Sequence, residues 1–477
     1  MYTIPKLAAL ALLACVPAAL ASFTNTAGSV RAEGADAQRA NPATELENCD
    51  GARFQEKRAQ MEKGVCDMLW VGDSITDFLE TGSGAEVYKK YYERRNPIDL
   101  GISGIRTGHV LWQLENAPLD KIHPKMAVVM IGTNNIGHDH STPAQTVEGI
   151  RKIVGKLKAS FPEMKILLLE VFPRQANPDE KYRLEVNEIN GGLRALYAGD
   201  KVENVWLRGI GDLFLNADGT LRADLMPDCL HPSKEGYEVW ASAIEPYVIE
   251  ALGEVPEEMV GKPNDGAEWM ERFKEKCDLL RENKRGYQIL MLGDSITHYF
   301  EKSVFDEQEA LTPIWNRYYG DLGAINLAHG GDMTMQLIWR LDRYPLENVH
   351  PKLAMVLIGV NNVATDHSYE GTAYATRHVV KELRRHFPEI KVIVLKCLPN
   401  MWTGNKKYTR IVNEYNEVLP LYFRDLDYVE VVDISDIFRN EDGYVNLNFL
   451  PDRVHPNRDG YLLWGERLKG KVAEKLK

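Results

Sequence analysis

Short apolar runs alternate with longer stretches of helical periodicity along most of this chain. In the first half the apolar runs are 68–71, 98–100, 126–131, 166–171 and 205–207, and the helical stretches include 143–160 and 232–252. Thr142 is placed to cap the first of these helices, with Pro143 at its first position. Strands that alternate with helices predict βαβ units, and therefore a parallel sheet covered by helices on both faces.

The same pattern occurs twice along the chain. The stretch Gly-Asp-Ser-Ile-Thr at 72–76 recurs at 293–297, and further matched stretches follow in the same order: 131–135 with 358–362, 161–163 with 387–389, and 228–232 with 452–456. We therefore predict a tandem duplication of a whole domain, with one copy at 49–253 and the other at 267–477. A Pro-, Glu- and Gly-rich linker at 254–266 is expected between them.

The first 48 residues are expected to precede the folded domains. Lys6 is followed by an apolar run that ends at small residues, which is typical of a signal peptide at 1–21. A lipoprotein signal ending at Cys15 is the alternative, and either one predicts export. The run is too short for a comfortable membrane span. Residues 22–48 are rich in small and polar side chains, which predicts a flexible tether.

Charge and cysteine usage narrow the function classes. The formal net charge is -12 and no basic block stands out, so a nucleic acid is not an expected partner. The six cysteines form no C-x-x-C pair, which disfavours a zinc site, and Cys49 with Cys66 is a candidate disulfide. A metal site at 138–140, His-Asp-His, is disfavoured because its counterpart at 365–367 lacks one histidine. The tyrosine pairs at 91–92 and 318–319 are expected in the core rather than as sugar platforms.

A serine at the tip of each Gly-Asp-Ser turn is a candidate nucleophile. Each turn follows an apolar strand, which exposes a hydroxyl above a sheet, and the serine then needs a base to react at neutral pH. A histidine with an aspartate three residues before it can supply that base. The candidates are Ser74, His231 and Asp228 in the first copy, and Ser295, His455 and Asp452 in the second.

Either motif alone reads as a turn or as a helix cap with a surface histidine, but both recur together. Pro232 and Pro456 are expected in the first turn of the helix that follows each histidine.

Two further positions in each copy can donate hydrogen bonds to a developing oxyanion. A glycine follows the second strand and an asparagine follows the third, at the sheet edge where active sites of such folds lie. The candidates are Gly104 and Asn134 in the first copy, and Gly331 and Asn361 in the second. The second copy has Ala328 where the first has Gly101, from which we expect a changed loop shape rather than lost chemistry.

These four blocks together resemble the SGNH (GDSL-type) hydrolase superfamily. Residues 98–104, 110–114 and 132–135, and 330–332 in the second copy, are similar to the catalytic subunits of platelet-activating-factor acetylhydrolase. Similar domains occur in bacterial sialate and other carbohydrate O-acetylesterases. The resemblance implies an α/β fold of two tandem three-layer α/β/α sandwich domains, each with a flavodoxin-like five-stranded parallel sheet. It also implies hydrolysis through an acyl-enzyme, with no metal or organic cofactor.

The sequence thus predicts an exported serine esterase with two active sites that removes short acyl groups, acetyl above all, from carbohydrate. A lipase-like or phospholipid acetyl hydrolase is the alternative enzyme, although no long apolar lid segment is visible. A hypothesis of a different class is that one copy, the second rather than the first, is a binding or scaffolding module. The loops at 172–175 and 398–402 differ between the copies, so the two sites are expected to prefer different esters.

Overall fold

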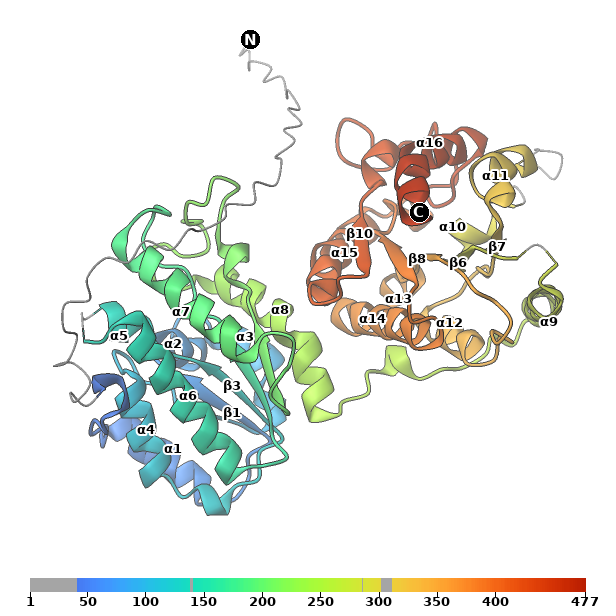
Figure 1. The fold of residues 1–477 in the computed structure, drawn as a ribbon. Helices are drawn as coiled ribbons and strands as arrows, with labels where there is room; N and C mark the ends of the chain where they lie inside the picture. Colours follow the sequence, from blue (N-terminus) through green and yellow to red (C-terminus); the bar gives the residue numbers. More distant parts are fainter. Residues whose placement is uncertain (1–40, 138–139, 285, 302–310) are drawn as a thin grey trace, which may run out of the picture. The chain divides into compact units, whose positions relative to one another are not determined.

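The structure, a computed structural model, describes residues 41–137, 140–284, 286–301 and 311–477. Each copy of the duplicated sequence forms a five-stranded parallel sheet with helices on both of its faces (Figure 1). The strand order is β2-β1-β3-β4-β5 in the first domain and, in the same sense, β7-β6-β8-β9-β10 in the second. The predicted fold class is therefore confirmed.

The strands and helices of the first domain alternate along the chain. The strands are β1 (Met68–Gly72), β2 (Pro97–Asp99), β3 (Met126–Met130), β4 (Lys165–Leu169) and β5 (Val205–Arg208). The helices are α1 (Ala52–Met61), α2 (Ser74–Thr81), α3 (Ala85–Tyr91), α4 (Thr107–Asn116), α5 (Thr133–Gly137), α6 (Pro143–Ser160), α7 (Lys181–Tyr197) and α8 (Lys234–Leu252).

The second domain repeats this order. Its strands are β6 (Ile289–Gly293), β7 (Ala324–Asn326), β8 (Leu353–Leu357), β9 (Lys391–Leu395) and β10 (Val429–Val432). Its helices are α9 (Ala267–Glu282), α10 (Ser295–His298), α11 (Thr312–Tyr318), α12 (Thr334–Leu341), α13 (Val360–Ala364), α14 (Tyr369–His386), α15 (Lys406–Val418) and α16 (Arg458–Lys475).

Two layers of core explain why the strands are apolar at nearly every position. In β1, Leu69 and Val71 join one hydrophobic cluster, which includes Ile153 of α6, while Met68 and Trp70 join another around Trp240 of α8. Because successive side chains of a strand point to opposite faces, a sheet covered on both sides needs apolar residues in both registers. All five residues of β1 are buried.

The predicted domain boundaries need correction. A short 3-10 helix, Pro42–Thr44, packs on α4 and α6, and the Thr107 hydroxyl donates a 2.7 Å hydrogen bond to the Ala43 carbonyl. The second domain has the same device, because Thr334 donates to the Glu258 carbonyl in the 3-10 helix Glu257–Met259. The last residues of the expected tether (22–48) and part of the expected linker (254–266) thus belong to the domains. Residues 22–40 lie outside the described residues.

The helices after the two Asp-x-x-His motifs begin later than expected. Ser233 caps α8 by accepting the Gly236 N–H at 3.2 Å, and Asn457 caps α16 by accepting the Gly460 N–H at 3.0 Å. Pro232 and Pro456 therefore precede the caps instead of lying in the first turn, because a serine or asparagine oxygen satisfies the free helix N–H groups. Thr142 caps α6 with Pro143 at its first position, as predicted.

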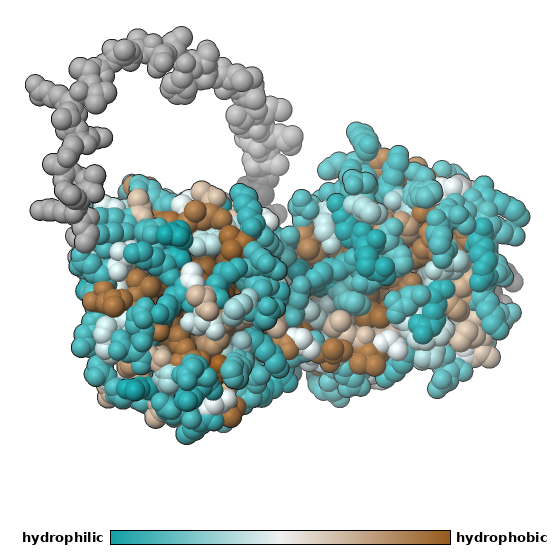
Figure 2. All heavy atoms as spheres, turned by 60° about the horizontal axis from the view of Figure 1, so that its bottom comes forward, coloured by the Kyte–Doolittle hydropathy of each residue, from teal (hydrophilic) through white to brown (hydrophobic). Residues whose placement is uncertain are grey.

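Other expectations concern single side chains. Cys49 and Cys66 are both free thiols in the structure, as are the other described cysteines, so the candidate disulfide is absent among the described residues. Both tyrosine pairs are buried, as predicted. Within the described ranges, no helix is both long and apolar enough to span a membrane. The surface face drawn in Figure 2 is mainly hydrophilic, with hydrophobic residues in scattered patches.

Candidate active site

The Gly-Asp-Ser turns place a serine at the first position of a helix in both domains. Asp73 caps α2, since its Oδ1 accepts the Ile75 N–H at 3.0 Å, and Asp294 caps α10 through the Ile296 N–H at 2.9 Å. A Cβ on the preceding glycine would clash with a threonine hydroxyl and with a carbonyl of the neighbouring strand in each domain, so glycine is required there. Ser74 and Ser295 therefore sit at the carboxyl ends of β1 and β6.

Each histidine is held by a tight turn that begins at its aspartate. In the first domain Asp228 Oδ1 accepts the backbone N–H groups of Leu230 and His231, at 3.0 and 2.7 Å. Between aspartate and histidine, Cys229 has a φ of 60° and its counterpart Arg453 has a φ of 72°. This left-handed backbone is uncommon for residues other than glycine and turns the chain so that the aspartate's second oxygen faces the imidazole.

The three predicted side chains meet in both domains. Ser74 Oγ lies 2.8 Å from His231 Nε2, and His231 Nδ1 lies 2.7 Å from Asp228 Oδ2. In the second domain the corresponding distances are 2.8 Å from Ser295 to His455 and 2.6 Å from His455 to Asp452. A hydroxyl bonded to an imidazole that is bonded in turn to a carboxylate is the arrangement of a Ser-His-Asp triad.

The imidazoles are packed against an aromatic ring and differ in exposure. Phe78 lies 5.0 Å from the His231 ring, and Tyr299 lies 5.1 Å from the His455 ring, measured between centroids. The His231 side chain is 23% exposed and that of His455 is 11% exposed. The second triad is therefore the more enclosed of the two.

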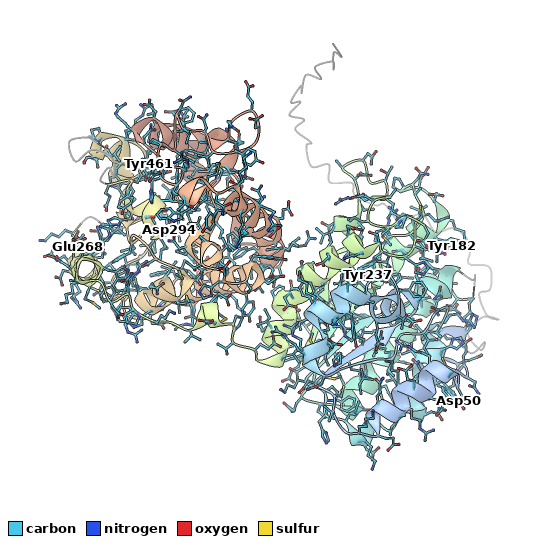
Figure 3. The ribbon with its side chains drawn as sticks, turned by 180° about the vertical axis from the view of Figure 1, so that it is seen from behind. Asp50, Tyr182, Tyr237, Glu268, Asp294 and Tyr461 are labelled. Carbon is cyan, nitrogen blue, oxygen red and sulfur yellow. The ribbon has the colours of Figure 1, made fainter. Side chains whose placement is uncertain are left out.

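In each domain a tyrosine of the last helix holds the helix that begins at the serine. Tyr237 of α8 donates a 2.7 Å hydrogen bond to the Ile75 carbonyl, and Tyr461 of α16 does the same to Ile296. Figure 3 labels Tyr237, and labels Tyr461 beside Asp294 of the second serine turn. Neither tyrosine stood out in the sequence, although both recur three positions before a buried tryptophan.

The predicted oxyanion donors lie on two loops that are tied together. Gly104 and Gly331 have φ values of 80° and 77°, and space is open where a side chain would stand. The Asn134 side-chain amide donates to the Ile105 carbonyl at 3.0 Å, and that of Asn361 donates to the Asp332 carbonyl at 2.8 Å. Each asparagine therefore lies directly against the loop of its glycine, and its second amide N–H has no acceptor among the described residues.

Sequence reasoning missed the residues that hold these loops. Asn135 accepts the Thr107 N–H at 3.1 Å and donates to the Thr107 hydroxyl, and Asn362 makes the same pair of bonds with Thr334. The two asparagines are fully buried. The signal was present in the repeated Asn-Asn pair, of which the first member faces the glycine loop and the second anchors it.

The alanine of the second domain leaves this loop intact. The Ala328 N–H donates to Asn326 Oδ1 at 3.0 Å, just as the Gly101 N–H donates to Asp99 Oδ1 at 2.7 Å. The expected change of loop shape thus does not extend to this bond or to the backbone of Gly331.

Burial and hydrogen bonding shift the pKa values of the serine-turn aspartates and of the triad aspartates in opposite directions. Burial raises the pKa of Asp73 to about 6 and that of Asp294 to about 7. Burial also acts on Asp228 and Asp452, but the hydrogen bonds that they accept from the histidines and the turn outweigh it and lower the pKa of both. The carboxylates beside the imidazoles are therefore ionised at neutral pH, as an imidazolium partner requires.

The histidine cluster at 138–140 falls mostly outside the described residues. Only His140 is described, and its Nε2 lies 3.4 Å from the Pro42 carbonyl and 3.6 Å from a Glu47 oxygen. Among the described residues no group of three or more His, Cys, Asp or Glu side chains is arranged to hold a metal ion.

Comparisons with known proteins place the chain in a family. The model of the GDSL-like Lipase/Acylhydrolase family matches residues 70–239 and again residues 291–463. The chain is 32% identical over 192 residues to platelet-activating factor acetylhydrolase IB subunit alpha2 of Gallus gallus. The aligned region covers 40% of this chain and 80% of the relative.

The solved structures that match this chain include a GDSL-like lipase from Bacteroides thetaiotaomicron, with 18% identity and a TM-score of 0.36 over 43% of this chain and 97% of the other. An acetylxylan esterase from Geobacillus stearothermophilus has 16% identity and a TM-score of 0.31 over 40% of this chain and 94% of the other. Because the family model matches most of the chain, in two successive regions, this protein belongs to the GDSL-like lipase/acylhydrolase family and is a carboxylic ester hydrolase.

Proposed function

We propose that the protein is an exported serine esterase with one active site in each domain, and that it removes short acyl groups, acetyl above all, from carbohydrate. The observation that carries the proposal is the pair of assembled triads, with 2.8 Å between serine Oγ and histidine Nε2 in both domains. Two intact triads also speak against the alternative that one domain has become a binding or scaffolding module.

The reaction would proceed through an acyl-enzyme. Ser74 Oγ attacks the ester carbonyl while His231 Nε2 takes its proton, and Asp228 stabilises the imidazolium that forms. The N–H groups of Ser74 and Gly104 and the amide of Asn134 would stabilise the oxyanion. His231 then protonates the leaving alcohol, and a water deprotonated by the same imidazole releases the acid. Ser295, His455, Asp452, Gly331 and Asn361 would take these roles in the second domain.

The acyl group and the alcohol rest on separate arguments. The names of the relatives, platelet-activating factor acetylhydrolase subunits, support acetyl as the acyl group. A pocket of about 590 Å³ next to Tyr299 and Gly330 is lined mainly by polar and charged side chains, three glutamates of α9 among them (Glu268 is labelled in Figure 3). Such a lining suits a hydroxyl-rich alcohol better than a lipid chain. The same relatives keep a phospholipid acetyl hydrolase as the second candidate.

The proposed export depends on residues 1–21, which lie outside the described residues. Their pattern supports cleavage before Ser22, with release into the periplasm or the medium, and lipidation at Cys15 is the alternative. The first residue of the mature protein, found by N-terminal sequencing, decides between the two.

Hydrolysis of p-nitrophenyl acetate by the mature protein tests the esterase proposal. Ser74→Ala and Ser295→Ala should each remove part of the turnover, and the double variant should remove all of it. If one single substitution abolishes turnover, the other domain is a binding module. If acetate is not hydrolysed but longer acyl chains are, the lipase-like alternative replaces the acetylesterase.

A further inference from the structure

The two domains differ in sequence in the loop that follows the fourth strand of each sheet. In both, this loop is fastened to the turn between the triad's aspartate and histidine. The Gln175 N–H donates to the Cys229 carbonyl at 3.0 Å, and the Met401 N–H donates to the Arg453 carbonyl at 3.2 Å. The next residue is Ala176 in the first domain and Trp402 in the second. In the second domain, Trp402 is thus adjacent in sequence to Met401, which contacts the turn of the second triad.

Trp402 is presented to solvent on a loop that is otherwise fixed. It is 52% exposed, whereas the tyrosine pairs that the sequence offered as alternative platforms are buried. Asn400, itself buried, accepts the Trp402 N–H at 2.7 Å, and the Thr409 hydroxyl donates to the Asn400 carbonyl at 2.7 Å. On its other side, Lys407 forms a 3.3 Å ion pair with Asp366, just after the loop of Asn361. The loop is therefore tied to the turn of the second triad and to the segment that follows Asn361.

Next to Trp402 along the chain lies a basic groove, the first turns of α15 together with the loop 439–445. It encloses about 670 Å³ and is lined by Lys406, Lys407, Arg410 and Arg439, with Asp442 as its single carboxylate. Tyr444 forms part of the wall, with Lys406 Nζ 4.2 Å from its ring centroid. So many cations around one groove run against the net charge of -12 of the chain.

At the matching positions the first domain keeps one of the four cations, Lys181 in place of Lys407, and lacks the other three. Matching hydrogen bonds align the two domains: the Val171 N–H donates to Asn190 Oδ1, and the Cys397 N–H donates to Asn416 Oδ1. On that alignment and that of the 215–221 and 439–445 loops, the counterparts of Lys406, Arg410, Arg439 and Tyr444 are Glu180, Leu184, Leu215 and Thr220. Three cations and an aromatic ring in the second domain thus stand where the first domain has an acid, two leucines and a threonine.

Two of these cations form no ion pair among the described residues. Arg439 donates to the Gly443 carbonyl and to Asn413 Oδ1, both at 2.7 Å, and burial lowers its pKa more than the charge of Asp433 raises it. Lys406 has no carboxylate partner among the described residues, while Arg410 meets Glu414 only at 3.9 Å. Guanidinium and ammonium groups with spare donors form charge-assisted hydrogen bonds to a carboxylate when one arrives.

We propose that Trp402 and this groove form a substrate-binding extension of the second active site that selects acyl esters carried on acidic saccharides. The apolar C–H face of a pyranose ring would stack on the indole of Trp402. The carboxylate of a uronate residue further along the same saccharide would bind Lys406, Arg410 and Arg439. The proposal rests on the proposed esterase function and names the substrate class of one of its two sites.

The test uses the full chain with Ser74→Ala, so that only the second site turns over. The substrates are acetylated xylo-oligosaccharides with and without a glucuronate branch, and p-nitrophenyl acetate as a reference too small to reach the groove. In the parent, kcat/KM should be higher for the branched acidic oligosaccharide than for the neutral one. Lys406→Gln combined with Arg410→Gln should lower the acidic-to-neutral ratio about ten-fold, which corresponds to about 1.4 kcal/mol, and 0.5 M NaCl should reduce the parent's preference as well.

Trp402→Ala should lower kcat/KM for both oligosaccharides relative to p-nitrophenyl acetate, mainly through KM, and Trp402→Phe should restore part of it. Lys391→Gln is the matched control, because this exposed lysine lies at the amino-terminal end of β9, at the other end of the strand from the active-site loops. It should leave both ratios unchanged.

Unchanged ratios in the groove variants, while hydrolysis of p-nitrophenyl acetate still depends on Ser295, would overturn the groove but not the esterase. An equal loss on all three substrates would also overturn it. The groove proposal would also be overturned if the groove variants lost only the binding of phosphatidylglycerol vesicles, measured separately, because that result would assign the surface to lipid.

Discussion

The buried aspartate of the second serine turn, Asp294, gives a stability prediction whose sign and size follow from its surroundings. Its Oδ1 caps α10, and its Oδ2 is buried without a partner among the described residues. Burial, with Asp332 nearby as a smaller contribution, raises its pKa to about 7. The folded protein therefore holds a proton on this group where the unfolded chain, with a pKa of about 3.9, has lost it.

A pKa raised on folding makes the protein lose stability as pH rises between the two values. The difference between a folded pKa of about 7 and an unfolded pKa of about 3.9 corresponds to about 4 kcal/mol, lost between about pH 4 and pH 8. Asp294→Asn keeps the cap, because the amide oxygen can accept the same N–H, and removes the titration. The amide N–H groups gain no partner, which costs about 1–3 kcal/mol at every pH.

We therefore expect Asp294→Asn to be less stable than the parent at pH 4 and more stable at pH 8. Between pH 4 and pH 8, the difference between variant and parent in the free energy of unfolding of the second domain should change by about 4 kcal/mol. This corresponds to a change of about 10 °C in the difference between their Tm values. Urea unfolding followed by tryptophan fluorescence at both pH values measures it, with Asp427→Asn, at an exposed position, as the control. A difference between variant and parent that is the same at pH 4 and pH 8 would refute the reasoning.

Two predictions concern the reacting groups. In a Ser295→Ala background, Asp228→Asn should lower kcat on p-nitrophenyl acetate about 10²–10⁴-fold with the fold unchanged, because the imidazole loses the carboxylate that fixes its tautomer; a loss below three-fold would deny Asp228 this role. In a Ser74→Ala background, Asn361→Ala should lower kcat about 10²–10³-fold with a smaller effect on KM, whereas a change in KM alone would make Asn361 a substrate-binding residue.

The layers of the fold and the triads were accessible from sequence for a physical reason. A strand buried on both faces must be apolar at every position, so runs such as 68–71 mark central strands directly. The triad members occupy short motifs whose spacing is set by local turns, and the duplication shows each motif twice. Both features survive without any knowledge of which segments meet in space.

What the sequence did not reveal depends on contacts between distant segments. The Thr107 hydroxyl binds the Ala43 carbonyl, so the domain begins before Cys49, yet nothing local to 42–48 announces that contact. The helix after His231 begins after Ser233, which caps it, whereas Pro232 alone suggested an earlier start because proline is favourable at the first helical position. The exposure of Trp402 depends on how Asn400 and Thr409 fix its loop.

Labelling with diisopropyl fluorophosphate tests the central claim, two independently activated serines in one chain, most directly. Intact-protein mass spectrometry should show two adducts on the parent, one each on Ser74→Ala and Ser295→Ala, and none on the double variant, with the modified peptides containing Ser74 and Ser295. A single adduct on the parent, or adducts that persist in the double variant, would contradict the account.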